Sequence, residues 1–165
     1  MKGLVHFMIL SACMLVASHA ANAQDCSDWS NRDLRGTYTM TGSGWIDLSK
    51  MVPTLPPGSI PMSWAGAFSW DGEGKGTGWV SINAGGVQMN IAFVNMTYDM
   101  KPDCSVAVSY SSRIKELGTT LGPDARILVV TGTPAALGLD GIQVGAGPGT
   151  MVDLLTARRI SMRFK

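Results

Sequence analysis

The feature that most constrains the fold of this chain is a set of short runs in which large and small side chains alternate. Successive side chains of a β-strand point to opposite faces, so a period of two residues is typical of a strand. No window beyond the first residues keeps the 3.6-residue repeat of an amphipathic helix. The clearest run places Met62, Trp64, Phe68 and Trp70 on one face and Ser63, Ala65, Ala67 and Ser69 on the other.

Turn-forming glycines and prolines separate these runs and divide the chain into strands. Two tight turns, at Asp71–Gly76 and 84–86, are typical of β-hairpins. A chain of 165 residues is long enough for one domain, which we assign to residues 24–165. The sequence predicts an all-β fold, an antiparallel up-and-down β-barrel of about eight strands. The expected strands are Gly36–Trp45, Met62–Trp70, Thr77–Asn83, Val87–Asp99, Ser105–Arg113, Arg126–Thr133 and Met151–Met162, with a short one around Ile142–Val144.

Two segments depart from simple alternation. Within Val87–Asp99 the apolar positions change phase after Phe93, which predicts a β-bulge near that residue. The segment Met51–Pro61 holds four prolines, and proline is excluded from central strands because it cannot donate a ladder hydrogen bond. We therefore expect a surface loop or lid there.

The first 23 residues predict export. Lys2 precedes an apolar stretch, and the small residues before position 24 suit cleavage by signal peptidase after Ala23. The stretch is shorter than a membrane span, so no stable membrane insertion is expected after processing. We expect a secreted or periplasmic protein. A minority alternative is a lipoprotein, because Leu10–Cys13 matches a lipidation motif that would modify Cys13.

Processing leaves two cysteines, Cys26 and Cys104, and an even count in an exported chain predicts a disulfide. It also removes His6 and His19, which are the two histidines of the sequence. Triads that use histidine and histidine-bound metals are therefore excluded, and we expect no metal and no cofactor. The formal net charge is +1, and loss of Lys2 makes it neutral, so no nucleic-acid partner is expected.

The aromatic residues are the strongest functional signal. If the bulky face of 62–70 points inward, an aromatic lumen could bind a hydrophobic small molecule. The alternative, weighed equally, is that the same side chains simply fill the core of a small barrel. The candidate ligand-binding residues are Trp64, Phe68, Trp70, Trp79, Met89, Phe93 and Tyr38.

An enzyme is the second hypothesis. A cofactor-independent cyclase or isomerase needs a shaped apolar pocket and one or two polar groups, for which the candidates are Asp153, Tyr110 and Asn90. Asp153 stands within an apolar run, where burial would demand a partner such as Arg126 or Arg158. A structural ion pair is the favoured interpretation of that aspartate.

A structural envelope protein that self-associates is the third hypothesis. Residues 127–130 are apolar at every position, as expected where both faces of a strand are covered. A homo-oligomer is therefore retained as a partner alternative beside the hydrophobic small molecule.

Three segments carry a resemblance, namely Leu34–Tyr38, Phe68–Gly76 and Tyr98–Ser105. Their order and turn residues resemble a group of small exported bacterial β-barrel proteins. In overall plan the chain is also similar to the allene-oxide-cyclase-like and dirigent-like barrels of the calycin type. That resemblance implies a barrel, and in some members a lumen that binds hydrophobic substrates and directs cyclisation. None of their catalytic residues can be matched to positions here.

Overall fold

The structure is a computed structural model that describes residues 25–50, 57–133, 137–143 and 151–161. The predicted leader and the alternative lipidation site at Cys13 lie outside these residues. Most of the proline-rich segment lies outside them too. Among the residues described, no helix is long and apolar enough to cross a membrane.

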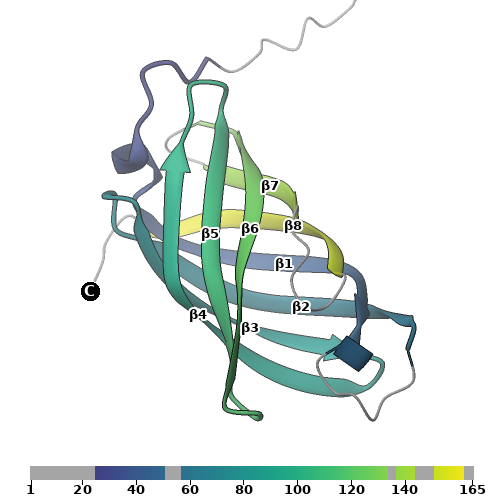
Figure 1. The fold of residues 1–165 in the computed structure, drawn as a ribbon. Coiled ribbons are helices and arrows are strands. Elements are labelled where there is room, and N and C mark those ends of the chain that lie inside the picture. Colours follow the sequence, from purple (N-terminus) through teal and green to yellow (C-terminus); the bar gives the residue numbers. More distant parts are fainter. Residues whose placement is uncertain (1–24, 51–56, 134–136, 144–150, 162–165) are drawn as a thin grey trace, which may run out of the picture.

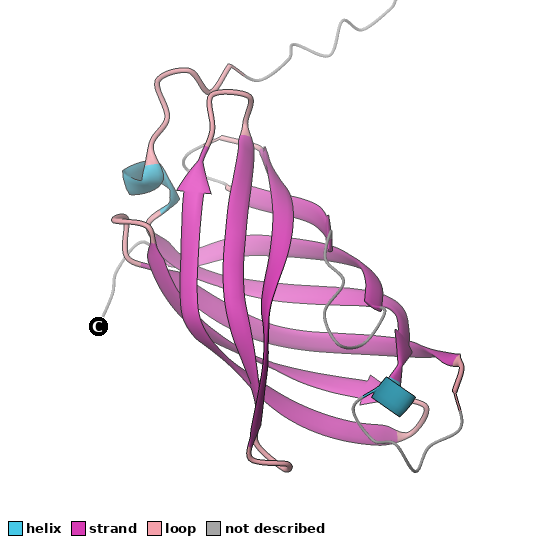
Figure 2. Ribbon diagram, in the orientation of Figure 1, coloured by secondary structure: helices cyan, strands magenta, loops and turns pink. Residues whose placement is uncertain are grey.

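Eight antiparallel strands form a closed barrel in which each strand pairs with the next and the last pairs with the first. This confirms the predicted all-β up-and-down topology (Figures 1 and 2). Two short 3-10 helices, η1 (Asn31–Leu34) and η2 (Leu48–Lys50), flank the first strand. The strands are β1 (Gly36–Asp47), β2 (Ser59–Trp70), β3 (Lys75–Ala84), β4 (Val87–Met100), β5 (Ser105–Ile114), β6 (Thr119–Thr131), β7 (Gly138–Gln143) and β8 (Met151–Ser161).

The alternation in sequence becomes the inside and the outside of the barrel. On β2 the side chains of Trp64, Phe68 and Trp70 are buried, whereas Ser63 and Ala65 on the opposite face are exposed. The bulky face therefore points inward, as the sequence predicts. The register places Trp64 opposite Gly42 of β1. A Cβ at Gly42 would lie 2.1 Å from the indole of Trp64, so only glycine leaves room for that ring.

A bulge in β4 confirms the predicted change of phase. The pairing of β4 with β5 shifts register between Val94 and Thr97, and Asn95 within this stretch has a φ of 54°. Phe93 and Met96 are three residues apart, so in a regular strand they would face opposite sides. The extra residue of the bulge lets both face the interior. The strand thus stays apolar inside on both sides of the bulge.

Several strands extend beyond their predicted bounds, and β6 does so by the most residues. The sequence places the start of a strand at Arg126, but β6 begins at Thr119 and passes through Pro123. The pairing of β5 with β6 shifts between Tyr110 and Ser112, near Pro123, and a proline is tolerated at such an irregularity. Likewise β2 begins at Ser59 and includes Pro61, which the sequence assigns to the loop.

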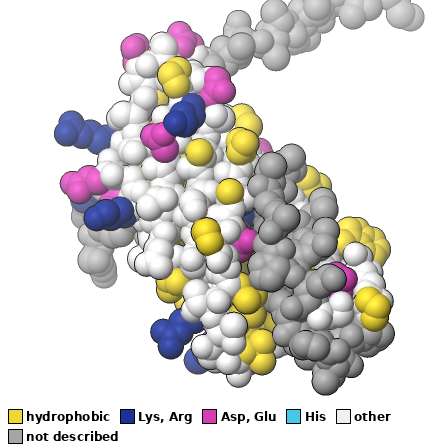
Figure 3. Space-filling model, viewed as in Figure 1, with side chains coloured by type: hydrophobic (Ala, Val, Ile, Leu, Met, Phe, Trp, Pro, Cys, Tyr) yellow, Lys and Arg dark blue, Asp and Glu magenta, His cyan; other side chains and the backbone are white. Residues whose placement is uncertain are grey.

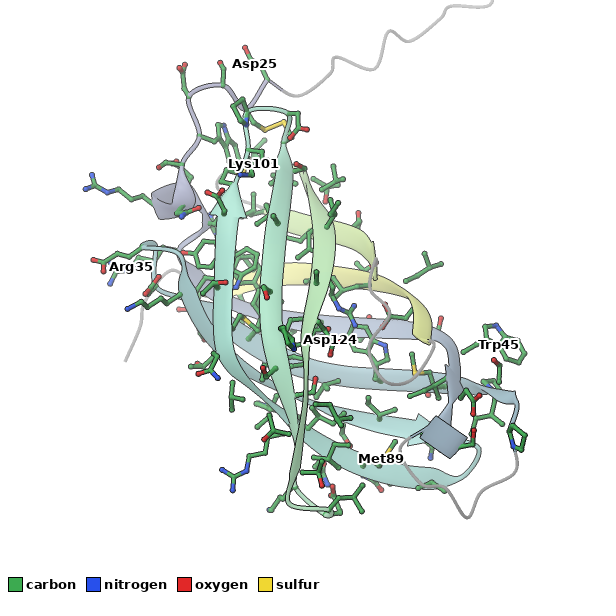
Figure 4. The ribbon with its side chains drawn as sticks, viewed as in Figure 1. Asp25, Arg35, Trp45, Met89, Lys101 and Asp124 are labelled. Carbon is green, nitrogen blue, oxygen red and sulfur yellow. A yellow bond between two sulfur atoms is a disulfide. The ribbon has the colours of Figure 1, made fainter. Side chains whose placement is uncertain are left out.

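The N-terminal segment is attached to one end of the barrel. Cys26 and Cys104 form a disulfide, as predicted, visible as the yellow bond in Figure 4. The side chain of Asn31 in η1 accepts a hydrogen bond from the Met100 amide (2.9 Å). Its amide group also lies 3.5 Å from the Tyr98 carbonyl oxygen. These contacts hold η1 against the end of the barrel where β4 turns into β5.

Candidate functional site

The interior of the barrel has two differently built regions. At the end near the disulfide, four aromatic rings stack, and we call them the aromatic end: Tyr38, Phe68, Trp70 and Tyr98. The ring centroids of Tyr38 and Phe68 lie 4.8 Å apart, and those of Trp70 and Tyr98 lie 4.3 Å apart. Phe68 and Trp70 join the two stacks at 4.9 Å. Such stacking adds to the stabilisation from burial of the rings.

Each polar atom of the aromatic end has a partner. The Tyr38 hydroxyl donates to the Leu34 carbonyl at 2.6 Å, and the Tyr98 hydroxyl accepts from the Gly72 amide at 2.7 Å. The indole nitrogen of Trp70 lies 3.4 Å from the sulfur of Met96. Burial raises the pKa of both tyrosine hydroxyls, so they remain neutral. The aromatic end is a filled core with its hydrogen bonds satisfied.

The second region, which we call the polar centre, consists of Tyr110 on β5, Arg126 on β6 and Asp153 on β8. Two guanidinium nitrogens of Arg126 donate to the two carboxylate oxygens of Asp153, at 3.0 and 2.8 Å. Arg126 Nε donates to the Tyr110 hydroxyl at 2.7 Å. The guanidinium also lies 5.5 Å from the centroid of the Trp64 ring, within reach of a cation–π interaction. This confirms the expected ion pair and identifies Arg126 as the partner of Asp153.

Burial shapes the charges in the polar centre. Asp153 is 1% exposed and Arg126 is 7% exposed, so each charge depends on the other for compensation. Burial raises the pKa of Tyr110, although Arg126 opposes this. Burial works to lower the pKa of Arg126, but Tyr110 and Asp153 outweigh it and the net change is upward. Tyr110 therefore stays neutral and Arg126 stays charged.

A second buried carboxyl, Asp124, was not among the sequence candidates. It is 9% exposed and lies on the same face of β6 as Arg126, opposite Tyr110 in the register. Burial raises the pKa of Asp124, and the charge of Arg126 only partly offsets this. Asp124 stands two residues before Arg126, a spacing that places both side chains on one face of a strand. The preceding Gly122–Pro123 resembles a turn, so the sequence did not predict a strand there.

A cavity of about 60 Å³ lies between the two regions. Its walls are mostly apolar, and Tyr110, Arg126 and Asp153 contribute the main polar groups. The buried indole nitrogen of Trp64, another lining residue, has no hydrogen-bond partner among the described residues. An apolar cavity of about 150 Å³ is sufficient for benzene, so this smaller space suits a group of a few atoms.

The structure brings most of the predicted ligand-binding residues into the interior. Trp64, Phe68, Trp70 and Phe93 line the cavity. Tyr38 and Met89 are buried but do not line it. Of the predicted catalytic residues, Tyr110 and Asp153 come together through Arg126, and both line the cavity.

The predictions that place Trp79 and Asn90 in the lumen are wrong, because both residues lie on the outside of the barrel. The Trp79 side chain is 56% exposed, since Val80 and Ile82 set the inward phase of β3 and leave Trp79 on the outer face. Asn90 follows Met89, whose side chain is buried, and therefore points outward. The Asn90 side chain donates to Glu116 at 2.7 Å. Neither residue reaches the lumen.

The outer face also carries exposed apolar side chains. Ile127 and Val129 on β6 are each 49% exposed, and Leu154 on β8 is 66% exposed. The run 127–130 thus alternates between the core, through Leu128 and Val130, and the surface. Within the described ranges, no group of three acidic, cysteine or histidine residues is placed to hold a metal ion.

Comparison with protein-family models, curated proteins and solved structures found no match. The eight-stranded barrel is therefore established by the structure alone. The resemblance to exported bacterial barrels and to allene-oxide-cyclase-like or dirigent-like proteins stays a prediction.

Proposed function

We propose that this protein, after export, binds a small and largely apolar molecule inside its barrel. The single observation that carries the proposal is an apolar cavity with one lining residue, Trp64, whose buried indole nitrogen has no acceptor among the described residues. Trp64 Nε1 has no partner among the described residues, and an unpaired buried donor costs about 1–3 kcal/mol. A ligand that supplied an acceptor would remove that cost on binding.

The walls of the cavity define the chemistry of the ligand. Phe68, Val80 and Leu128 provide apolar contacts. Arg126 and Asp153 compensate each other, so the polar centre offers no net charge to attract an ion. The preferred ligand is therefore a neutral molecule with an apolar body and one acceptor such as a carbonyl oxygen.

The polar centre has a positioning role in this proposal. The guanidinium of Arg126 lies against the Trp64 ring and is itself fixed by Tyr110 and Asp153. A fixed indole keeps its donor in one direction without further loss of side-chain entropy when the ligand binds. We expect Trp64 to contribute selectivity, and the surrounding apolar residues to contribute most of the affinity.

The experiment compares two probes of nearly equal shape. Butanone carries the acceptor, whereas in 2-methyl-1-butene a methylene group replaces the oxygen. Calorimetry on the disulfide-bonded protein should show tighter binding of butanone, by about tenfold for each 1.4 kcal/mol recovered. Trp64→Phe removes the donor and should abolish the preference. Equal binding of both probes, or no binding of either, would contradict the proposal.

The natural ligand can be sought directly. Native mass spectrometry of protein purified from its source should show a small adduct that organic solvent removes. The same spectrum reports the assembly state and so tests the self-association hypothesis. Absence of an adduct would contradict a ligand retained from the source.

A cofactor-independent isomerase or cyclase is a second candidate, and Asp124 favours it. Both oxygens of Asp153 are engaged by Arg126, so Asp153 is poorly placed to exchange a proton. Asp124 is buried on the same face of β6 as the cavity-lining Arg126 and opposite Tyr110, and burial raises its pKa, a shift that is typical of general acids. Asp124 does not itself line the cavity. If the chain turns over a substrate, Asp124→Asn should remove activity while Asn90→Ala, on the outer face, leaves it unchanged.

A further inference from the structure

The outer surface holds a second and larger concavity, which we call the outer groove. It has a volume of about 360 Å³ and lies over β3, β4 and the β5–β6 turn. This size falls within the range of about 300–1,000 Å³ that is typical of small-molecule sites. Its outward-facing lining residues are Trp79, Asn90, Ala92, Arg113, Lys115 and Gly118.

Trp79 provides a flat apolar surface in this groove. The register places Ala67 of β2 and Ala92 of β4 directly beside it. Neither alanine is large enough to cover an indole ring, which explains why Trp79 stays 56% exposed. A solvent-exposed tryptophan costs hydrophobic free energy that binding of a flat apolar face would recover.

Two cations lie on the opposite side of the groove. In the described part of the chain, the side chains of Arg113 and Lys115 form no hydrogen bond or ion pair. The nearby carboxylate of Glu116 accepts hydrogen bonds from the backbone and side chain of Asn90, at 2.7 to 3.1 Å. Glu116 therefore lies at the same edge of the groove, beside Asn90 and Lys115, whereas Arg113 has no carboxylate partner in the described part of the chain.

The spacing of the tryptophan and the arginine suits one sugar ring with an acidic group. Trp79 pairs with Ala92, and Ala92 pairs with Arg113, so two strand spacings separate the two residues. Neighbouring strands are about 4.8 Å apart, which puts the two backbones about 10 Å apart. The C–H face of a pyranose stacks on an aromatic ring. A guanidinium binds a carboxylate through two parallel hydrogen bonds.

We propose that the outer groove binds an acidic saccharide, with a pyranose ring stacked on Trp79 and its carboxylate paired with Arg113. Lys115 is a second cation at the same edge, where the carboxylate of Glu116 offsets its charge, so Arg113 supplies the uncompensated positive charge. The setting is open and hydroxyl-rich, since Thr77 and Ser81 flank Trp79 on the outer face of β3. Figure 3 shows Lys and Arg side chains projecting at the lower left, beside the β5–β6 hairpin that forms the lower tip of the barrel in Figure 1.

This site is on the other side of the sheet from the lumen, so it can be tested independently of lumen binding. The probe is tetragalacturonate, titrated by calorimetry into the full disulfide-bonded protein. The neutral control is the same oligomer with its carboxylates reduced to alcohols. We expect saturable binding of the acidic oligomer that weakens as salt is raised, and at least about tenfold weaker binding of the neutral one.

Matched variants assign the binding to the groove. Trp79→Ala and Arg113→Ala should each raise Kd by about tenfold. Trp45→Ala is the control, because Trp45 is 55% exposed on another part of the surface and should change Kd by less than about twofold. Both tryptophans are surface residues, so thermal melting should show that each variant folds.

Three results would overturn the proposal. The first is no binding of tetragalacturonate at millimolar concentration. The second is equal loss in Trp45→Ala and Trp79→Ala, which would indicate nonspecific contact with exposed tryptophans. The third is a dimer that Trp79→Ala dissociates, which would assign the outer groove to a second copy of the chain.

Discussion

The aromatic end and the polar centre occupy the same barrel but fill it differently. Rings at the aromatic end stack at 4.3 and 4.8 Å, a tilted pair at 4.9 Å joins the two stacks, and the polar atoms are satisfied by the chain itself. At the polar centre an ion pair takes the place of apolar packing, and the indole nitrogen of Trp64 is left without a partner among the described residues. The cavity lies between them.

The difference separates a region that side chains fill completely from a region that leaves a cavity. Rings adapt to one another by stacking and tilting, so they fill space well. A guanidinium and a carboxylate must meet in one plane, which fixes their positions and leaves gaps beside them. Replacing such a pair with apolar residues often stabilises a protein, so its presence is weak support for a purely structural role.

The largest expected effect on stability comes from the ion pair, and it tests whether the polar centre excludes water. Arg126→Met leaves the Asp153 carboxylate buried without its partner, and should lower the free energy of unfolding by about 3–5 kcal/mol. The double variant Arg126→Met with Asp153→Leu removes both charges and should recover most of that loss. Denaturant unfolding measures both. A cost below about 1 kcal/mol for the single variant would mean that the centre is hydrated.

The next effect concerns the aromatic end. The disulfide closes a loop with a sequence separation of 78 residues, and its removal should lower stability by about 2–4 kcal/mol. We expect Cys26→Ser with Cys104→Ser to speed hydrogen exchange at Tyr98 and Met100, which η1 covers. Exchange at Arg126 should change less. Uniform acceleration across the barrel would show that the two regions are not separable.

A matched pair of tyrosines compares the two regions at single-atom level. Tyr110→Phe removes the acceptor for Arg126 Nε, and a hydrogen bond to a charged group contributes about 1.5–3 kcal/mol. Tyr38→Phe removes a neutral bond to the Leu34 carbonyl, for which about 1 kcal/mol is typical. Thermal melting should therefore rank Tyr110→Phe as the more damaging. The reverse order would show that the hydrogen bond at the aromatic end contributes more to stability than the one at the polar centre.

The smallest expected effect is a pH dependence of the free energy of unfolding that arises from Asp124. Its pKa in the folded state is raised above 3.8 by burial, so the folded state binds the proton more tightly than the unfolded chain. This contribution to stability is present below the unfolded pKa and is lost as pH rises through the folded pKa. Asp124→Asn removes this loss, so the free energy of unfolding of the variant relative to wild type should rise as the pH is raised from 3 toward neutrality, as denaturant unfolding at several pH values would show.

Asp103→Asn is the control of opposite sign. Hydrogen bonds from Ser105 lower the pKa of Asp103, so its contribution is present at neutral pH and is lost on acidification. The stability difference between this variant and wild type should therefore shrink as pH falls. If both variants follow the same pH trend, the account of Asp124 is wrong.

The fold was largely predictable because alternation determines which face of a strand is buried. The bulge near Phe93 and the inward direction of Trp64 both followed from the phase of apolar residues. Trp79 was misassigned because it was grouped with other aromatic residues although Val80 and Ile82 set the opposite phase. The catalytic role predicted for Asn90 is wrong for the same reason, because the neighbouring Met89 faces inward and Asn90 therefore faces outward.

The candidate site was less predictable because it depends on contacts between distant strands. Asp153 was recognised as a buried charge in an apolar run, but the sequence left Arg126 and Arg158 as equal partners. The register decides between them: Arg158 lies on the outer face, where it binds the Thr131 hydroxyl, while Arg126 points inward. The cavity and the unpaired Trp64 donor arise from three-dimensional packing, for which no pattern in the sequence gives a signal.

The proposed lumen site depends most on the buried indole N–H of Trp64, which has no acceptor among the described residues. The most direct measurement is the ¹⁵N–¹H signal of that indole in the disulfide-bonded protein during titration with butanone. The account predicts a saturable downfield shift of this proton, with the indole signals of Trp45 and Trp79 unchanged. An unchanged Trp64 signal at saturating butanone, or equal shifts at all three tryptophans, would contradict it.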